Sequence, residues 1–263
     1  MSSHAVPGAR LAAMVGGAVL DSVAAVGRAG ALSASALRAL RNTEIWMPHF
    51  VPQLAAVGVA SVPIALFISA FTGVVLAIQA SYTFTGTVPL YFVGTLVGKT
   101  IILELGPVLT GLALAGRVGA NIAAEIGTMR VTEQIDALES LAYDPLAYLV
   151  VPRVLAGALM FPLVVALAIA TGIATGWLTS LFMLDLSTPQ FVRGLKLFFL
   201  VFDVRFALIK AVSFGLIVTG VGCFFGYTCT RGAAGVGIAT TRAVVVASMM
   251  ILVLDAFWAA VLL

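Results

Sequence analysis

Long apolar stretches separated by short polar segments form the main pattern along this chain. The intervals 45–98, 154–184 and 211–230 contain no Asp, Glu, Lys or Arg. A helix that crosses a membrane needs about 20 predominantly apolar residues, and each interval is long enough to hold at least one such helix. The pattern therefore predicts an all-α integral membrane protein.

One surface helix and about five membrane spans are expected. Residues 8–41 mix small apolar residues with single charges, a composition that suits a helix lying at the membrane surface. A bend is expected at residues 46–50, which contain a proline. The spans are expected within 54–80, from about 89 to 119, within 146–184, over about 206–227, and after 242 to the C-terminus. A polar turn at 81–87, a polar connection at 185–205 and a Gly-rich loop at 228–242 join them.

The composition agrees with a membrane protein. Of the 263 residues, 62% are hydrophobic and 10% are charged, whereas soluble domains carry roughly a quarter of charged residues. The net charge of +3 is small and dispersed, so no nucleic-acid partner is expected. Cys223 and Cys229 have no candidate ligands nearby, and we expect small buried thiols and no metal site.

The distribution of basic residues indicates the orientation in the membrane. With the N-terminus in the cytoplasm, the inner segments hold nine basic residues and the outer segments hold four. The inner ones are Arg10, Arg28, Arg38, Arg41, Arg117, Arg130, Arg153, Arg231 and Arg242, and the outer ones are Arg193, Lys196, Arg205 and Lys210. We therefore expect a multi-pass membrane protein with a cytoplasmic N-terminus, the connection between the second and third spans in the cytoplasm, and the C-terminus on the outer side.

A charged segment separates the second and third expected spans. It holds five of the eleven acidic residues of the chain, with Arg130 among them: Glu125, Glu133, Asp136, Glu139 and Asp144. Such a segment must face water. Val131, Ile135 and Leu138 are spaced as one face of a helix, and Arg130 and Glu133 are spaced as an i,i+3 ion pair.

Two interpretations of this segment remain. It is a solvated connector, or it is a helix on which a partner protein docks. Its acidic bias favours docking, because an acidic segment is repelled by the anionic inner leaflet. The following Asp144-Pro145 pair predicts the start of a helix, with Asp as the cap and Pro at the first helical position.

Three ionisable residues fall at membrane depth, where charge is costly and marks functional positions. Lys99 and Glu104 are five residues apart, so they face different sides of a helix and are not expected to pair with each other. Lys99 either reaches the interface with its long side chain or has a functional role. Glu104 and Asp255 are further candidates.

Other motifs point to packing. Three pairs of glycines at i,i+4 spacing favour close helix contacts in lipid: Gly94/Gly98, Gly172/Gly176 and Gly222/Gly226.

The chain has no complete phosphate-binding loop, and His4 and His49 are its only histidines. An enzyme with its own catalytic site is therefore not expected.

Several motifs together resemble one family. Their order along the chain matches the MlaE-type permeases of ABC transporters from about residue 46 to the end. They are ELGPVL at 104–109, AGRVG at 115–119, AEIGTMR at 124–130, TEQIDAL at 132–138, Asp144-Pro145, Asp203 with Leu208-Ile-Lys210, GIATTRAVV at 237–245, and Leu254-Asp255. The resemblance implies a permease transmembrane domain over 46–263 in the inner (plasma) membrane, and the composition of the preceding part favours an N-terminal interfacial segment over 1–45.

The resemblance also implies function and partners. It implies a homodimer, a cytoplasmic ABC ATPase docked on each copy, and an MCE-domain protein on the outer side. The family moves phospholipids or other hydrophobic molecules between the inner membrane and the outer envelope. ATP and Mg would be bound by the ATPase, so no cofactor is expected in this chain.

The charged segment then resembles the family's coupling helix, which transmits motion from the ATPase. The residues implied for coupling are Glu125, Gly127, Met129, Arg130, Glu133, Gln134, Asp136 and Leu138. One position departs from the family: Leu103 stands where an arginine is often found before the ELGP motif. Lys99, one helical turn earlier, is a candidate substitute for that arginine.

Two other functions are compatible with the pattern. An ion-coupled secondary transporter requires interacting ionisable residues at mid-membrane and often an internal repeat. Lys99, Glu104 and Asp255 are the only candidates, and no clear repeat is present. A non-transporting membrane scaffold would use the acidic segment to recruit a partner.

Overall fold

The computed structural model describes residues 7–84, 88–230 and 232–262, which contain helices and turns but no strand. Five helical segments of this part are long and apolar enough to cross a membrane: Thr43–Thr83, Phe92–Val131, Leu146–Met183, Val201–Tyr227 and Gly232–Leu262. The predicted all-α membrane class and its five spans are confirmed. Residues 85–87 of the predicted polar turn lie outside the described residues.

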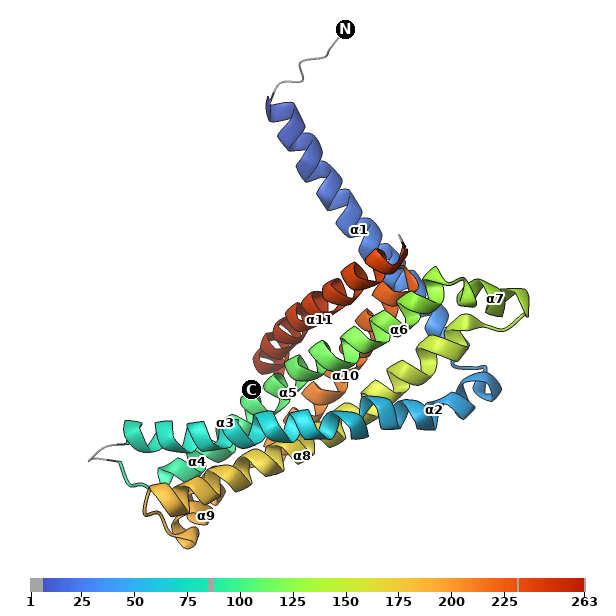
Figure 1. The fold of residues 1–263 in the computed structure, drawn as a ribbon. Helices are drawn as coiled ribbons and strands as arrows, with labels where there is room; N and C mark the ends of the chain where they lie inside the picture. The colour runs from blue at the N-terminus through green and yellow to red at the C-terminus, as the bar shows by residue number, and fades with distance from the viewer. Residues whose placement is uncertain (1–6, 85–87, 231, 263) are drawn as a thin grey trace.

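The N-terminal part forms α1 (Pro7–Ala39), α2 (Thr43–Val57), the short 3-10 helix η1 (Val59–Ser61) and α3 (Val62–Thr83). In Figure 1, the N-terminal end of α1 projects away from the bundle. Residues 46–50, where a bend was predicted, lie inside α2, which contains Pro48, and the chain leaves the helical conformation at Arg41 and Asn42. The indole Nε1 of Trp46 donates to the Leu40 carbonyl across this turn, at 3.1 Å.

The second span is one helical run with two π-helical turns. It contains α4 (Phe92–Thr100), the π turn η2 (Ile101–Leu105), α5 (Gly106–Leu114), the π turn η3 (Ala115–Gly119) and α6 (Ala120–Val131). The span was expected to end near Gly119, but α6 continues it because this helix packs against α10 and α11. The short helix α7 (Gln134–Ser140) follows. Part of the charged segment thus extends a span.

The third span begins with the π turn η4 (Leu146–Val150) and continues as α8 (Val151–Met183). Asp144 Oδ1 accepts hydrogen bonds from the amides of Leu146 and Ala147, at 3.0 and 3.3 Å. The predicted Asp cap is confirmed. The carboxylate satisfies amides that lack a partner in the first turn of a helix.

The remaining helices are α9 (Thr188–Leu197), α10 (Val201–Tyr227) and α11 (Gly232–Leu262). The predicted connection at 185–205 therefore contains a helix and the start of α10. The predicted loop at 228–242 is also wrong, because α11 is helical from Gly232 onwards. The small residues of this segment suggested a loop, but in the structure they are packed within a helix. Gly235 and Ala239 are buried in α11.

Helix α8 lies between α3 on one side and α10 on the other, and α10 in turn packs against α6 and α11 (Figure 1). The α3–α8 contact is so close that a Cβ atom on Gly73 would lie 2.0 Å from the carbonyl oxygen of Gly172. Ser69 Oγ donates to the Ala168 carbonyl across the same contact. Backbones can approach in this way only where side chains are minimal.

The predicted packing role of the glycine pairs is confirmed at all three. Each glycine faces a neighbouring helix at a distance that leaves little or no room for a Cβ atom: Gly94 and Gly98 face α9, Gly172 faces α3 and η2, Gly176 faces α3 and α4, and Gly222 and Gly226 face η3 and α6. The cysteines also behave as expected, since both are free and buried. Burial raises the pKa of the Cys229 thiol, so this group stays protonated at neutral pH.

Candidate functional site

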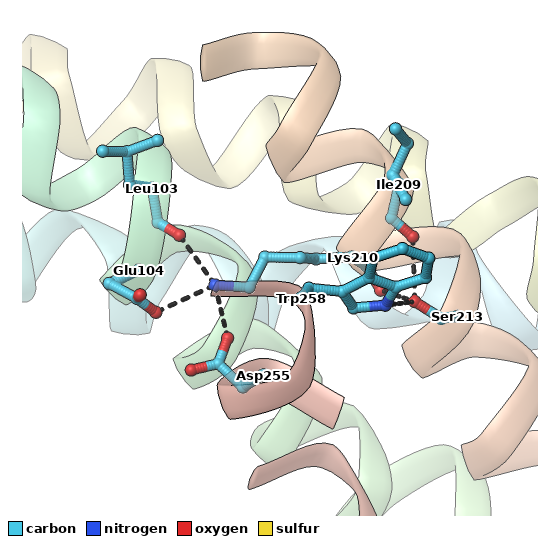
Figure 2. A network of polar contacts seen from close by, with 7 residues as sticks. All are labelled: Leu103, Glu104, Ile209, Lys210, Ser213, Asp255 and Trp258. Atoms are coloured by element: carbon cyan, nitrogen blue, oxygen red, sulfur yellow. Dashed lines mark hydrogen bonds and ion pairs between the residues drawn. The ribbon is translucent and has the colours of Figure 1, made fainter. Parts of the chain in front are cut away.

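Three ionisable side chains from three spans meet within the membrane region (Figure 2). Lys210 Nζ on α10 lies 3.0 Å from Glu104 Oε2 on η2 and 2.5 Å from Asp255 Oδ1 on α11. It also donates to the Leu103 carbonyl at 3.0 Å. The Lys210 side chain is 0% exposed, Glu104 is 41% exposed and Asp255 is 19% exposed. The cluster holds one positive and two negative groups if all are ionised.

Both carboxylates contact the ammonium. Glu104 accepts a hydrogen bond from Lys210 Nζ, and Asp255 pairs with the same ammonium through Oδ1. The ammonium also lies 4.7 Å from the ring centroid of Phe206. A buried ammonium is stable only when it is paired and hydrogen-bonded. These contacts provide that environment for Lys210.

The π turn η2 helps to place the acceptors. A π turn interrupts the regular α-helical hydrogen-bond ladder, and such turns occur frequently at functional positions. In η2 the backbone carbonyl of Leu103 and the side chain of Glu104 both face Lys210. The position where an arginine was expected therefore supplies a carbonyl acceptor to the cluster.

Helix α11, which carries Asp255, is hydrogen-bonded to α10 close to the cluster (Figure 2). Trp258, three residues after Asp255 on α11, donates from Nε1 to Ser213 Oγ at 2.9 Å. The Ser213 hydroxyl lies 2.9 Å from the carbonyls of Ile209 and Lys210. Residues three apart share a helix face, so the Trp258 contact fixes the face of α11 that carries Asp255.

A second ion pair lies at the start of α10. Lys99 Nζ is 2.8 Å from Asp203 Oδ2, and the same oxygen accepts from the Leu200 amide at 3.0 Å. The suggestion that Lys99 substitutes for an arginine beside Glu104 is wrong, because Lys99 pairs with Asp203 instead. As expected from their spacing, Lys99 and Glu104 have different partners.

The central member of the cluster, Lys210, was not among the predicted site residues. The orientation count placed it on the outer side, although it lies in α10 and its side chain is fully buried. One feature of the sequence could have identified Lys210. Asp203 and Lys210 are seven residues apart, which puts both on one face of a helix. An acidic and a basic residue at that spacing at the start of an apolar span predict partners on neighbouring helices.

The predicted coupling residues lie on both sides of a break in the helix. Helix α6 ends at Val131, and Glu133 adopts a left-handed conformation with φ of 60° before α7 begins. The predicted pair of Arg130 with Glu133 is wrong, because Arg130 Nη1 contacts Asp136 Oδ1 at 2.6 Å. This pair spans the break and links α6 to α7.

The expected apolar face of one continuous helix is also wrong, because Val131 and Ile135 belong to different helices. Ile135 is nevertheless fully buried and Leu138 packs against the same core. These two side chains anchor α7 on the bundle. The acidic side chains of α7 consequently face outwards.

The eight predicted coupling residues differ in how far their side chains are exposed to solvent. Glu125, Glu133, Gln134 and Asp136 are exposed, Met129, Arg130 and Leu138 are half-buried, and Gly127 is buried. Glu125 contacts Arg153 Nη2 at 3.1 Å and Asn121 Nδ2 at 2.8 Å. The segment therefore combines a packed inner side with an exposed, mainly acidic outer side.

Arg117 in the π turn η3 makes a further link that was not predicted. Its Nη1 lies 2.6 Å from Ser61 Oγ and 3.5 Å from the Ala56 carbonyl. Both acceptors flank the break between α2 and α3. The guanidinium thus joins the second span to the junction of α2 and α3 in the first span.

Comparisons with known proteins agree with this architecture. The family Permease MlaE matches residues 50–261 of the chain. The probable ABC transporter permease protein RP096 of Rickettsia prowazekii is 38% identical over 244 residues, covering 93% of this chain and 94% of the relative. The probable ABC transporter permease protein slr1045 of Synechocystis is 42% identical over 205 residues, covering 78% of each chain. The intermembrane phospholipid transport system permease protein MlaE of Haemophilus influenzae is 36% identical over 242 residues, covering 92% and 93%.

Proposed function

Because the chain belongs to the MlaE permease family, we propose that it is the permease subunit of an ABC transporter for phospholipids or related hydrophobic molecules. The transport runs between the inner membrane and the outer envelope. The printed function of the Haemophilus influenzae relative, intermembrane phospholipid transport, supports this substrate class. The five apolar spans support a role within the membrane.

The partners follow from the same proposal. A second copy of the chain forms the dimer, a cytoplasmic ABC ATPase supplies ATP hydrolysis, and an MCE-domain protein receives or delivers lipid on the outer side. The N-terminus then lies in the cytoplasm together with α7. The sequence holds no nucleotide-binding motif of its own, which supports the need for a separate ATPase.

The observation that carries the proposal is the packed connection between α7 and the second span. Helix α7 is fixed by the buried Ile135 and by the Arg130–Asp136 pair. Helix α6 continues directly into the span and packs against α10 and α11. A force applied at Glu133 is therefore passed along α6 and changes its position against two other spans.

The cluster around Lys210 lies on the same path. Glu104 belongs to the span that ends in α6, whereas Lys210 and Asp255 belong to the two spans that α6 contacts. A shift of the second span against α10 and α11 changes the distances within the cluster. Buried ionic contacts of this kind favour discrete arrangements, because an unpaired buried charge is costly.

The experiment uses two acidic residues with matched backbone geometry. Glu133 and Asp185 both have positive φ, at 60° and 51°, and they lie beyond opposite ends of the third span. In proteoliposomes containing the permease and the ATPase that co-purifies with it, Glu133→Lys should abolish ATP-driven transfer of labelled phospholipid. Asp185→Lys makes the same charge change at a similar conformation and should leave transfer and ATPase binding unchanged. Normal transfer in the Glu133 variant would exclude the coupling role.

One observation favours a second candidate, an ion-coupled secondary transporter: three ionisable groups do meet at membrane depth. Such a transporter needs no ATPase and responds to an ion gradient. The same proteoliposomes separate the two functions. Lipid transfer driven by a pH gradient in the absence of ATP would support the secondary transporter, and transfer that requires ATP would exclude it.

A further inference from the structure

A cavity of about 760 Å³ lies where α1 meets the end of α10 and the beginning of α11. Figure 1 shows α1 passing the α10–α11 turn at this end of the bundle. Its lining comes from all three helices and from the short connection between two of them: Ala25, Arg28, Phe224, Phe225, Thr228, Cys229, Thr230, Gly235, Ile238, Ala239 and Arg242. The cavity is separate from the Lys210 cluster and from α7.

The polar part of the lining is positively charged. Arg28 reaches the cavity from α1 and Arg242 from α11, and no carboxylate is among the described side chains that line it. Helix α11 begins at Gly232, and the first amides of a helix lack partners within it, which adds positive potential. Two guanidinium groups around one cavity repel each other unless an anion lies between them.

The other part of the lining is apolar and comes from the adjoining ends of two spans. Phe224 and Phe225 are close to the end of the fourth span, and Ile238 is in the second turn of the fifth. The ends of spans are where the hydrocarbon core meets the headgroup layer. The cavity therefore offers cationic donors beside an apolar surface, the combination that an amphipathic anion requires.

We propose that this cavity binds the phosphate-bearing headgroup of an anionic phospholipid. Arg28 and Arg242 hold the phosphate, because guanidinium groups form strong charge-assisted bonds to phosphate oxygens. Phe225 and Ile238 contact the adjoining apolar part of the lipid. The bound lipid links α1 to α10 and α11, so it acts as a structural ligand of the N-terminal helix. The inference does not depend on the transport function.

The test measures binding of short-chain phosphatidylglycerol to the purified, delipidated full chain in mild detergent by titration calorimetry. Arg28→Gln and Arg242→Gln should each weaken binding at least roughly tenfold, because each removes a charge-assisted contact. Arg38→Gln is the matched control, since Arg38 is also an exposed arginine on α1 but does not line the cavity. Unchanged affinity in both cavity variants would overturn the proposal.

A second pair of variants tests the proposal independently in case the arginine variants fail to fold. Ile238 is 47% exposed, so its replacement is well tolerated by the fold. Ile238→Glu places a carboxylate in the cavity and should weaken binding about as much as the loss of one arginine. Ile238→Gln removes the same apolar contact without adding a charge and is the reference of similar size, so Ile238→Glu should bind clearly more weakly than Ile238→Gln. Equal affinities of these two variants would also overturn the proposal.

The source of the phosphate is decided by two further ligands. Inorganic phosphate should compete weakly with phosphatidylglycerol, because it lacks the apolar part that Phe225 and Ile238 contact. Competition at equal concentrations would instead identify a site for free phosphate. Short-chain phosphatidylcholine should bind at least several-fold more weakly, because its headgroup carries no net charge. Equal binding of this lipid would reject the assignment to anionic phospholipids.

Discussion

The ammonium group of Lys210 lies 2.5 Å from Asp255 Oδ1 and so joins α10 to α11 within the membrane region. These residues are 45 positions apart in the sequence and belong to the fourth and fifth spans. Glu104 brings the second span to the same ammonium. Three spans thus meet at one fully buried charge.

Replacing Lys210 by Met tests the energetic importance of this cluster. The variant leaves Glu104 and Asp255 facing each other without a cation, and removal of one partner from a buried ionic cluster costs about 3–5 kcal/mol. We expect a clearly lower thermal unfolding temperature of the detergent-solubilised protein.

A triple variant provides the control for that substitution. Adding Glu104→Gln and Asp255→Asn to Lys210→Met removes the uncompensated negative charges. This variant should regain most of the lost stability. If Lys210→Met alone is as stable as the original chain, the cluster contributes little to folding.

The two roles of Asp203 can be separated by substitution. Its Oδ2 atom accepts from both the Lys99 ammonium and the Leu200 amide. Asp203→Asn removes the charge but retains an oxygen acceptor, whereas Asp203→Ala removes both contacts. We expect Asp203→Ala to be about 1 kcal/mol less stable than Asp203→Asn, the typical cost of losing a helix cap. Amide hydrogen exchange at residues 200–204 should rise more in the Ala variant, and equal exchange in both would contradict a capping role.

The α3–α8 contact predicts opposite effects for two glycine substitutions. Gly73→Ala forces a Cβ atom against the Gly172 carbonyl and should destabilise the protein by about 1–3 kcal/mol or more. Gly237→Ala on α11 meets nothing within 4 Å and should be neutral or up to about 1 kcal/mol stabilising, because Ala has the higher helix propensity. Thermal unfolding of both variants measures the difference, and similar values would exclude close packing at Gly73.

The Arg130–Asp136 pair predicts a large effect on coupling with a small effect on stability. Both side chains are substantially exposed, and surface ion pairs contribute less than about 1 kcal/mol. Arg130→Asp should therefore leave the unfolding temperature nearly unchanged while it displaces α7 and reduces ATP-driven lipid transfer. The exchanged variant Arg130→Asp/Asp136→Arg restores the pair and should recover transfer. Failure of that recovery, with ATPase binding intact, would show that the individual charges matter more than the link.

The sequence alone was sufficient for the class of protein and the approximate positions of the spans. The cost of placing charge in hydrocarbon is a local property, so the charge-free intervals predict the spans directly. The same reasoning identified Glu104 and Asp255. Asp144 as a helix cap was also predictable, because its partners are the next few amides in the chain.

Tertiary structure decided the partners of the charges and the ends of several helices. Lys210 and Glu104 are 106 residues apart, so no local pattern relates them, and their contact depends on how α10 packs against η2. Helix α6 extends beyond Gly119 because α10 and α11 provide surfaces for it, and the Gly-rich start of α11 is helical where propensity favours a loop. Arg130 pairs with Asp136 because the helix breaks between them. Local chemistry thus fixed which residues are costly to bury, and packing between distant helices determined which groups compensate for that cost.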